Sequence, residues 1–267
     1  MNRMPVGIGV DAGSATLKAV AVDAGGNIIA SIIEPTKPRI GEQAEHQIAS
    51  ILQQVGQPNA QSINIVATGY GRKLVERASE QVTEITCHAK GIFRNFHHGG
   101  TLVDVGGQDS KVIVIADDGH VVDFAMNDKC AAGTGRFLEH AAARLDIPLE
   151  QMGELALRND HPAVITSTCT VFAESEIISL LAEGTKTEDI LSGLHLSLVS
   201  RLVGLVKSVG YRPPLMMSGG VAKNKAIQAY LSRSLGDNVR VPAQPQMMGA
   251  YGAALIALDK CRGVKEV

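Results

Sequence analysis

The chain has 267 residues, enough for about two compact domains that bury roughly three quarters of their surface without disulfides. Its 25 Lys and Arg and 27 Asp and Glu give a net charge of −2. No basic run is dense enough to neutralise a phosphate backbone, so we expect neither nucleic acid nor a membrane as a partner. Apolar runs are too short for a signal peptide or a membrane span, so we expect a cytoplasmic protein. The 28 glycines favour a phosphate-like ligand that approaches the backbone closely.

The first part of the chain predicts a strand hairpin followed by a helix and another strand. Apolar runs on either side of the turn Ala24–Asn27 predict the hairpin. Apolar residues at helical spacing before Gly56 and Pro58 predict the helix. The predicted elements are strands at 6–11, 17–23, 27–33 and 63–68 and a helix at 42–56, and one or two helices then lead to a turn at 97–100.

From residue 101 the opening pattern recurs. The segment 101–124 repeats the order strand, Asp-x-Gly, strand, turn, strand, and an aspartate and a lysine lie seven residues apart in both copies, as Asp11 and Lys18 and as Asp104 and Lys111. Such self-similarity indicates an internal duplication. We therefore expect two α/β halves, at 1–98 and 99–248, whose facing loops form a cleft for a nucleotide.

The remainder of the second half is predicted to be mostly helical. Helices are expected at about 134–145, 171–183, 187–209, 222–235 and 249–260, with a strand at 215–218. The last helix contains Gly249, Gly252 and several alanines, small residues that allow tight packing, and we expect it to pack back on the first half.

Each Asp-x-Gly loop joins two strands in a way that suits a phosphate group. Where side chains are missing, backbone N–H groups can point at an anion, and the aspartate can hold Mg²⁺ through water. One such loop alone is ordinary turn chemistry, but two copies in matched context favour a nucleotide. The candidate residues for ATP or ADP are Gly13, Ser14, Thr16 and Lys18 in the first loop and Gly106, Gly107 and Asp109 in the second.

A third glycine-rich segment follows the predicted strand at 215–218. Gly219 and Gly220 stand between that strand and a helix, and Asn224 comes shortly after them. The paired glycines would let adenosine or its α-phosphate approach the backbone. Taken alone, the segment also fits a left-handed cap that joins a strand to a helix.

The four cysteines, Cys87, Cys130, Cys169 and Cys261, are too few and too spread for a disulfide framework. Cys130 and Cys169 each precede a predicted helix, whose N-terminus stabilises a thiolate; the alternative is a pair of small buried apolar residues. A 4Fe-4S cluster takes four thiolates, so a two-fold homodimer with two cysteines per chain could share one cluster. We expect Cys261 to fray with the terminus, and Cys87 and the adjacent His88 to point apart.

The two phosphate loops and the segment 216–224, in this order, resemble the acetate and sugar kinase/Hsp70/actin superfamily. This resemblance implies an α/β, actin-like ATPase fold of two duplicated RNase H-like halves around a nucleotide cleft. Within it, the chain is similar to the BadF/BadG/BcrA/BcrD ATPase family of 2-hydroxyacyl-CoA dehydratase activators and benzoyl-CoA reductase ATPase subunits. The segments that carry this similarity are Val10–Ser14, Ala67–Arg72, Glu84–Gly91, Asp104–Lys111, Asn127–Glu139, Ser167–Glu176 and Ser218–Asn224.

The resemblance implies a homodimer that holds one 4Fe-4S cluster between its protomers on Cys130 and Cys169. In that family ATP hydrolysis changes the angle of the helices leading from the cluster, and a low-potential electron passes to an iron–sulfur acceptor enzyme. A ferredoxin or flavodoxin is implied as the donor. The acceptor would be a 2-hydroxyacyl-CoA dehydratase, a benzoyl-CoA reductase or a double-cubane cluster protein.

For an ATP-driven electron transferase we assign Mg²⁺ and the attacking water to Asp11 and Asp104, and the orientation of that water to Gln108 or Asp109. A small-molecule kinase of the same fold is the alternative, but it needs an aspartate base and an insertion for its substrate, for which 267 residues leave little room. An actin-like or Hsp70-like assembly ATPase would need a large lid or peptide domain that this chain lacks.

Overall fold

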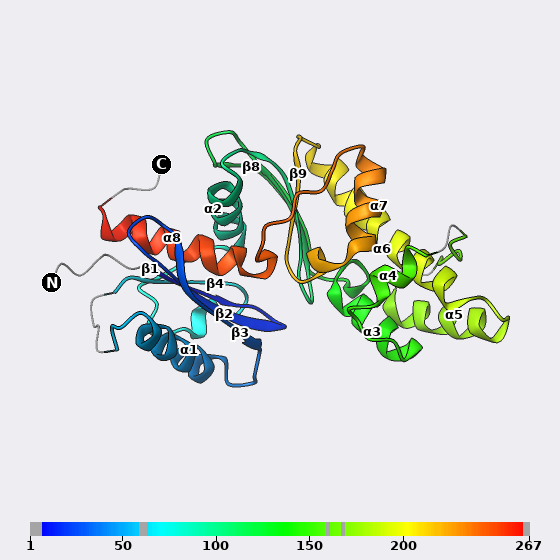
Figure 1. The fold of residues 1–267 in the computed structure, drawn as a ribbon, viewed down its shortest axis with the longest axis horizontal. Helices are drawn as coiled ribbons and strands as arrows, with labels where there is room; N and C mark the ends of the chain where they lie inside the picture. Colours follow the sequence, from blue (N-terminus) through cyan, green and yellow to red (C-terminus); the bar gives the residue numbers. More distant parts are fainter. Residues whose placement is uncertain (1–6, 59–62, 159–160, 167–168, 264–267) are drawn as a thin grey trace. The chain divides into compact units, whose positions relative to one another are not determined.

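The computed structural model describes residues 7–58, 63–158, 161–166 and 169–263. The described residues form two compact units, each built on its own sheet (Figure 1). Unit 1 takes its residues from 1–98, 117–121 and 246–267, and unit 2 from 99–116 and 122–245. The C-terminal helix therefore belongs to the same unit as the N-terminal strands.

Unit 1 contains a five-stranded sheet in the order β3-β2-β1-β4-β5. Its strands are β1 (Gly7–Ala12), β2 (Thr16–Val22), β3 (Ile28–Pro35), β4 (Ile65–Thr68) and β5 (Glu80–Gln81). β1 runs antiparallel to β2, which places Asp11 opposite Lys18, and parallel to β4, which places Asp11 beside Thr68. The sheet register thus gathers three polar residues at the carboxyl end of β1.

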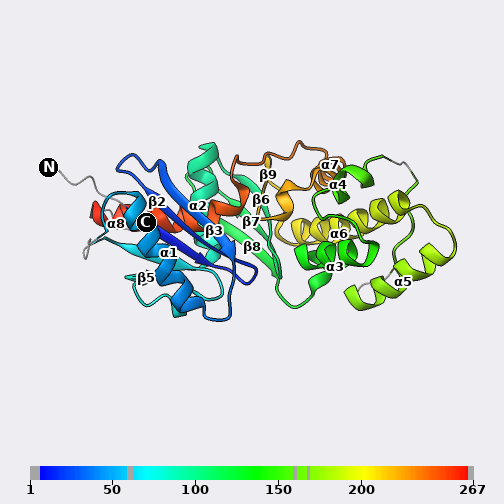
Figure 2. The same cartoon turned by 60° about the horizontal axis from the view of Figure 1, so that its bottom comes forward.

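Helices cover both faces of this sheet: α1 (Ile40–Gln54) lies on one face and α8 (Met248–Cys261) on the other, as Figures 1 and 2 show. Ile8 and Val10 of β1 share a hydrophobic core with α1. The alternate residues Gly7 and Gly9 face α8, where a Cβ at Gly9 would lie 2.0 Å from the carbonyl oxygen of Ala250. The backbones of β1 and α8 are therefore in direct contact.

The same close approach joins α8 to α2 (Glu84–Phe96). A Cβ at Gly252 would lie 1.7 Å from the carbonyl oxygen of Cys87, and a Cβ at Gly91 would lie 2.3 Å from that of Met248. Cys87 is fully buried in this contact. Glycine is required at these positions by space and not by backbone conformation.

Unit 2 contains a four-stranded sheet in the order β8-β7-β6-β9, which repeats the order of the first four strands in unit 1. Its strands are β6 (Gly100–Val105), β7 (Ser110–Ile115), β8 (Val121–Asn127) and β9 (Leu215–Ser218). Asp104 pairs with Lys111 across β6 and β7 and lies beside Ser218 of β9. The two sheets therefore share one register around an aspartate, as expected for an internal duplication.

The helices of unit 2 surround α6 (Thr187–Val209), which packs on β6 and β7 and contacts α4, α5 and α7 (Figure 2). The others are α3 (Gly135–Leu145), α4 (Met152–Ala156), α5 (Thr170–Ala182) and α7 (Lys225–Leu235), and the 3-10 turns of the described chain are Arg72–Leu74, Ala131–Gly133, Val221–Lys223 and Pro245–Met247. By length and composition α6 could span a membrane, but 56% of its most apolar window is buried inside the protein. We therefore regard it as a core helix.

Several elements differ from the prediction. The helix expected from 222 begins at Lys225, because Val221–Lys223 is a 3-10 turn and the Asn224 side chain caps the helix. Neither β5 nor α4 was predicted, since each is too short to show a period. Cys261 is the last residue of α8 and its Sγ lies 3.3 Å from Asn64 Nδ2, so the expectation that this cysteine frays with the terminus is wrong. The residue predicted to open the first strand, at position 6, lies outside the described residues, as do Ser167 and Thr168.

A buried histidine joins α6 to α7. His195 Nδ1 lies 2.7 Å from the carbonyl oxygen of Leu191, and its Nε2 lies 2.9 Å from Asn224 Nδ2. The ring therefore donates through Nδ1 and accepts from the amide through Nε2. Burial lowers the pKa of His195 from 6.5 to about 4, so the ring is neutral in the folded protein at pH 7.

Replacing Gly252 by Ala should destabilise unit 1, because the new Cβ forces α8 away from the Cys87 carbonyl. We expect a loss of about 1–3 kcal/mol in the free energy of unfolding, measured by urea denaturation. Gly204→Ala in α6 is the matched control, since nothing lies within 4 Å of its Cβ position, and it should be neutral or stabilising by up to about 1 kcal/mol. Equal effects of the two variants would contradict the assigned packing.

The neutral state of His195 should make stability fall in acid. Below about pH 6.5 the unfolded chain binds a proton that the folded chain does not, so stability is lost as the pH falls towards about 4, by up to about 3 kcal/mol. Urea titrations at several pH values should show a shallower loss for His195→Gln than for the natural chain. Parallel pH profiles would show that His195 carries no such linkage.

Candidate functional site

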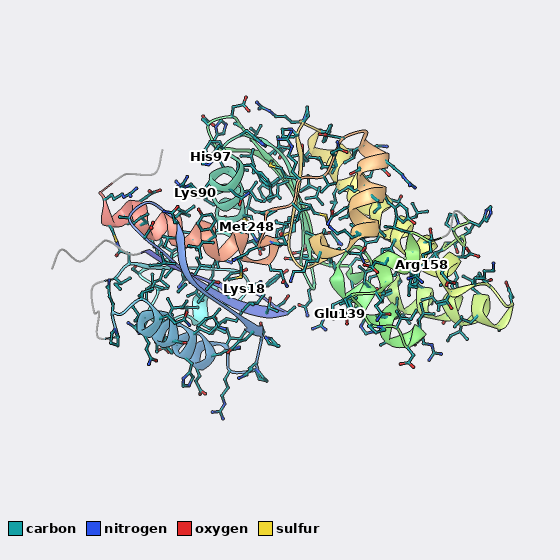
Figure 3. All side chains as sticks on the ribbon, viewed as in Figure 1. Lys18, Lys90, His97, Glu139, Arg158 and Met248 are labelled. Atoms are coloured by element: carbon teal, nitrogen blue, oxygen red, sulfur yellow. The ribbon has the colours of Figure 1, made fainter. Side chains whose placement is uncertain are left out.

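The carboxylate of Asp11 stands at the end of β1 with a lysine from the neighbouring strand. Lys18 Nζ lies 3.0 Å from Asp11 Oδ2, and both side chains are largely buried. Figure 3 labels Lys18 on the sheet of unit 1 and Met248 at the start of α8. The first turn of α8 also approaches this carboxylate, through Gly249. A desolvated ion pair of this kind is held by the β1–β2 register.

Three glycines from separate segments surround this carboxylate. A Cβ at Gly69, just after β4, would lie 2.5 Å from Asp11 Oδ1, and a Cβ at Gly249, in α8, would lie 3.1 Å from Oδ2. A Cβ at Gly13 would lie 3.2 Å from Lys18 Nζ. Gly69 also has a positive φ of +83°, which disfavours any other residue. The glycines place backbone instead of bulky side chains next to the carboxylate and its Lys18 partner, an arrangement that suits an approaching phosphate with its Mg²⁺.

Two further polar residues line this cradle, and the sequence did not single them out for it. Thr68 Oγ1 is buried and has no hydrogen-bond partner among the described residues. His88 is buried on α2, and its Nε2 would lie 2.8 Å from a Cβ at Gly249, the same position that Asp11 Oδ2 approaches. The sequence signal for Thr68 was its place at the end of a strand that pairs in parallel with β1. No local pattern indicated His88, because α2 and α8 meet only through tertiary packing.

The corresponding aspartate of unit 2 is enclosed by other side chains. Ser218 Oγ donates a 2.6 Å hydrogen bond to Asp104 Oδ1, and Lys111 Nζ lies 3.4 Å from Oδ2. The same ammonium lies 2.8 Å from Asp109 Oδ2. Lys111 thus links two buried carboxylates, and both oxygens of Asp104 already have a partner within unit 2. The duplicated aspartates have different surroundings despite their shared register.

The predicted nucleotide residues of unit 2 are drawn together around the end of β6. The amide of Gly106 donates to the carbonyl oxygen of Asp109 at 3.0 Å, which closes the second phosphate loop. Gly219 has a φ of +85°, and a Cβ there would lie 2.2 Å from the carbonyl oxygen of Val105. Gln108 and Gly220 are exposed, while Gly13, Ser14, Thr16, Lys18, Gly106, Gly107 and Gly219 are half-buried. The exposed Gln108 side chain is free to turn toward a ligand.

The Asn224 side chain caps α7 and bonds to α6. Its Oδ1 accepts hydrogen bonds from the amides of Ala226 and Ile227, which caps α7, and its Nδ2 bonds to His195 Nε2. These bonds use both ends of the side-chain amide. A contribution of Asn224 to nucleotide binding would therefore come through the placement of its backbone.

The two predicted metal ligands lie in unit 2 in related but unequal settings. Cys169 is the residue just before α5. Cys130 precedes a 3-10 turn, Ala131–Gly133, and α3 begins at Gly135, close to its predicted start, so Cys130 lies further from its α-helix than Cys169 does. The intervening turn arises because Thr134 bonds back to Ala131. Both cysteines are half-buried and outside any disulfide.

The helices that follow the two cysteines pack against each other. Thr170 and Phe137, near the starts of α5 and α3, line the same small cavity. Further along, Arg144 Nε lies 3.6 Å from Glu174 Oε1. The two helices that follow Cys130 and Cys169 therefore contact each other within unit 2.

A stripe of apolar side chains is exposed on α5 next to Cys169, with the exposed Glu174 among them. Val171 and Phe172 are each 68% exposed, and Ile178, one to two turns later, is 41% exposed. Apolar side chains grouped in this way mark a surface for another protein. Among the described residues no three His, Cys, Asp or Glu side chains form a metal-binding group, so two thiols of one chain would need further ligands from elsewhere to complete a cluster.

The site can be compared with known proteins. The sequence model of the BadF/BadG/BcrA/BcrD ATPase family matches residues 8–257. The activator of lactoyl-CoA dehydratase from Anaerotignum propionicum is 43% identical over 253 residues, which cover 94% of this chain and 97% of the relative. The 2-hydroxyisocaproyl-CoA dehydratase activator of Clostridioides difficile is 39% identical over 256 residues, 96% of each chain.

Solved structures agree with this similarity. Component A of the (R)-2-hydroxyglutaryl-CoA dehydratase of Acidaminococcus fermentans has a TM-score of 0.91 at 38% identity, with 97% of this chain and 99% of that chain covered. The Clostridium difficile activator with bound ADPNP has a TM-score of 0.88 at 37% identity, with 98% and 99% covered. A ROK family glucokinase from Streptomyces griseus, at a TM-score of 0.59, 14% identity and coverage of 94% and 98%, shares the fold alone. The predicted actin-like ATPase fold is confirmed.

The phosphate loops, the glycine cradle and the two cysteines all fall within the matched residues 8–257. Relatives above 30% identity extend over nearly the whole chain. The chain belongs to the BadF/BadG/BcrA/BcrD ATPase family.

Proposed function

We propose that this protein is an ATP-hydrolysing electron transferase that delivers a low-potential electron to an iron–sulfur acceptor enzyme. The observation that carries the proposal is the presence in unit 2 of both a phosphate loop and two half-buried thiols on adjacent helices. Nucleotide chemistry and a redox group on the same packed unit can be coupled mechanically. Relatives named as dehydratase activators support the acceptor class, a 2-hydroxyacyl-CoA dehydratase or a double-cubane cluster protein.

ATP with Mg²⁺ binds the phosphate loops in this proposal. Asp11 is the stronger candidate for Mg²⁺ and its water, because a lysine occupies only its Oδ2 and glycine backbone adjoins its Oδ1. Asp104 acts from a more enclosed position, with Lys111 and Ser218 as fixed partners. Gln108 is exposed and can orient the attacking water, with Asp109 as the alternative. ADP and ATP must bind two arrangements of the protein with different affinities, since only a differential affinity can shift a conformational equilibrium.

The thiols of Cys130 and Cys169 would hold one 4Fe-4S cluster shared by two copies of the chain. The donor set fits, since each chain offers two half-buried thiols before two helices that contact each other, and a cluster takes four thiolates. The exposed stripe of α5, which begins directly after Cys169, supports a second copy as the neighbour at this point. When bound, the cluster supplies the one-electron redox couple.

The remaining parts of the proposal concern partners and location. A ferredoxin or flavodoxin would supply the electron, and the homodimer would pass it to the acceptor enzyme. A net charge of −2 gives no attraction to nucleic acid or an anionic membrane. These properties fit a cytoplasmic protein that works under anaerobic conditions.

The cluster is tested by anaerobic reconstitution with iron and sulfide, followed by iron analysis and absorption spectroscopy. The natural chain should bind about two iron atoms per chain and elute as a dimer, and Cys130→Ser and Cys169→Ser should each lose the brown chromophore. Cys261→Ser is the control, because that thiol is exposed at the end of α8, and it should retain full iron. An iron-free natural chain, or full iron in the Cys130 and Cys169 variants, would refute the proposal.

Two variants that replace an aspartate by asparagine distinguish the roles of Asp11 and Asp104. Asp11→Asn should reduce ATP hydrolysis about a hundredfold or more, because a neutral amide is a poor Mg²⁺ ligand, while the iron content stays unchanged. Both variants remove a charged partner from a largely buried lysine, but Asp104→Asn should lower the free energy of unfolding more, by about 1–3 kcal/mol, because the bond from Ser218 also loses a charged acceptor. Hydrolysis at the natural rate in Asp11→Asn would contradict the role of Asp11.

A further inference from the structure

We infer that the first turn of α3 couples the position of Cys130 to the phosphate loop of unit 2. The position of Cys169 does not depend on this connection. The inference rests on the proposed function. The amide of Gly135 donates to the carbonyl oxygen of Gly106 at 2.8 Å, and the amide of Arg136 donates to that of Gly107 at 2.9 Å. Two consecutive donors of a helix start thus hold two consecutive carbonyls of the phosphate loop.

These bonds use amides that a helix start ordinarily leaves without an intrahelical partner. Their geometry fixes the opposite edge of the loop, because a peptide unit is planar and its N–H points away from its C=O. The carbonyl of Gly106 shares a peptide unit with the amide of Gly107, and the carbonyl of Gly107 shares one with the amide of Gln108. When α3 holds the two carbonyls, it therefore sets the direction of the Gly107 and Gln108 amides, the groups available to a phosphate.

The link requires glycine at position 135. A Cβ there would lie 2.9 Å from the carbonyl oxygen of Gly106 and 3.4 Å from the Cα of Gly107. The first distance is shorter than real Cβ contacts allow, so any side chain would push α3 off the loop. The backbones touch without an intervening side chain that could absorb a movement.

From Gly135 the connection to Cys130 is short and internally bonded. Thr134 is buried, and its amide and Oγ1 both donate to the carbonyl oxygen of Ala131, at 3.0 and 2.8 Å. Asn127 Nδ2 donates to the carbonyl oxygen of Cys130 at 2.8 Å. A Cβ at Gly133 would lie 3.1 Å from the same Asn127 amide nitrogen. The segment from 127 to 136 is therefore a compact loop, and a rotation of the Gly106 and Gly107 peptides displaces Cys130 with it.

Cys169 is anchored differently. Its carbonyl oxygen accepts from the amide of Ala173 within its own helix, and the preceding Thr166 is bonded to Glu176, also of α5. These bonds tie Cys169 to α5 itself. A movement of the phosphate loop on nucleotide binding should thus displace Cys130 and leave the start of α5 comparatively unchanged.

Hydrogen–deuterium exchange of the anaerobically purified protein tests the inference, with ADP, with a non-hydrolysable ATP analogue and without nucleotide. Nucleotide binding should slow exchange in the peptide 130–137 about tenfold, since phosphate contact stiffens the loop that holds it, and should leave 169–176 within about twofold. Nucleotide affinity is measured in parallel by calorimetry. Bound nucleotide with equal protection of both peptides, or with protection of 169–176 alone, would overturn the inference while the proposed function stands.

A variant pair adds a second arm. Gly135→Ala should bind nucleotide more weakly, because the loop amides are displaced, and at saturating nucleotide it should still lack the nucleotide-dependent protection of 130–134. Its ATP-driven electron transfer should fall at least about tenfold with iron content unchanged. Gly204→Ala, a glycine of α6 with open space around its Cβ position, should behave as the natural chain. Identical exchange in the two variants would overturn the inference. If Gly135→Ala fails to fold, the comparison of the two peptides in the natural chain decides by itself, and failure of the natural chain to bind nucleotide would refute this link and the proposed function together.

Discussion

An aspartate–lysine pair across an antiparallel hairpin is the interaction on which both units are built. In each unit the aspartate lies at the end of the central strand, and the lysine lies opposite it on the neighbouring antiparallel strand, in the same register. Burying two charges is costly unless each has a partner. The aspartate–lysine pair therefore limits which other groups can lie next to the carboxylate. In unit 1 glycines adjoin Asp11, whereas in unit 2 Ser218 and Asp109 complete a closed network around Asp104 and Lys111. The duplication has thus produced two buried carboxylates, one bordered by glycine backbone and one enclosed by side chains.

Much of this arrangement could be predicted from the sequence, because it depends on local spacing. The seven-residue interval between aspartate and lysine, the apolar runs and the turn residues predicted both hairpins and the duplication. The fold class followed from the resemblance of the two loops and the segment 216–224 to a known ATPase superfamily. The difference between the two aspartates could not be predicted, since it depends on Thr68 and Ser218, which occupy equivalent places on strands far along the chain. Ser218 bonds to its aspartate and Thr68 does not, a difference in rotamer and surroundings that no spacing records.

The cysteines illustrate the same limit. Similar flanking patterns predicted two equal helix starts, but Cys130 is separated from α3 by the turn Ala131–Gly133, while Cys169 directly precedes α5. Thr134 makes the difference, because its hydroxyl and amide stabilise a tight turn that competes with the helix. The sequence showed the glycines of this segment but could not show that Gly135 faces Gly106, since that contact joins residues on different elements. The small residues of α8 predicted tight packing on the first half, but local spacing could not identify Gly9 of β1 and the Cys87 carbonyl of α2 as the groups they meet.

Several glycines of this chain allow direct contact between backbones, and such contacts transmit small movements. Side chains in a packed core can change rotamer and absorb part of a small displacement, but two backbones in contact have no such freedom. At Gly9 and Gly252 the helix α8 lies directly on β1 and α2, and at Gly135 the helix α3 lies directly on the phosphate loop. Each candidate phosphate-binding loop is thus followed by rigid neighbours within its own unit. A shift of a few tenths of an ångström at a carbonyl must be transmitted as movement of a whole helix, which is what coupling between a nucleotide and a distant thiol requires.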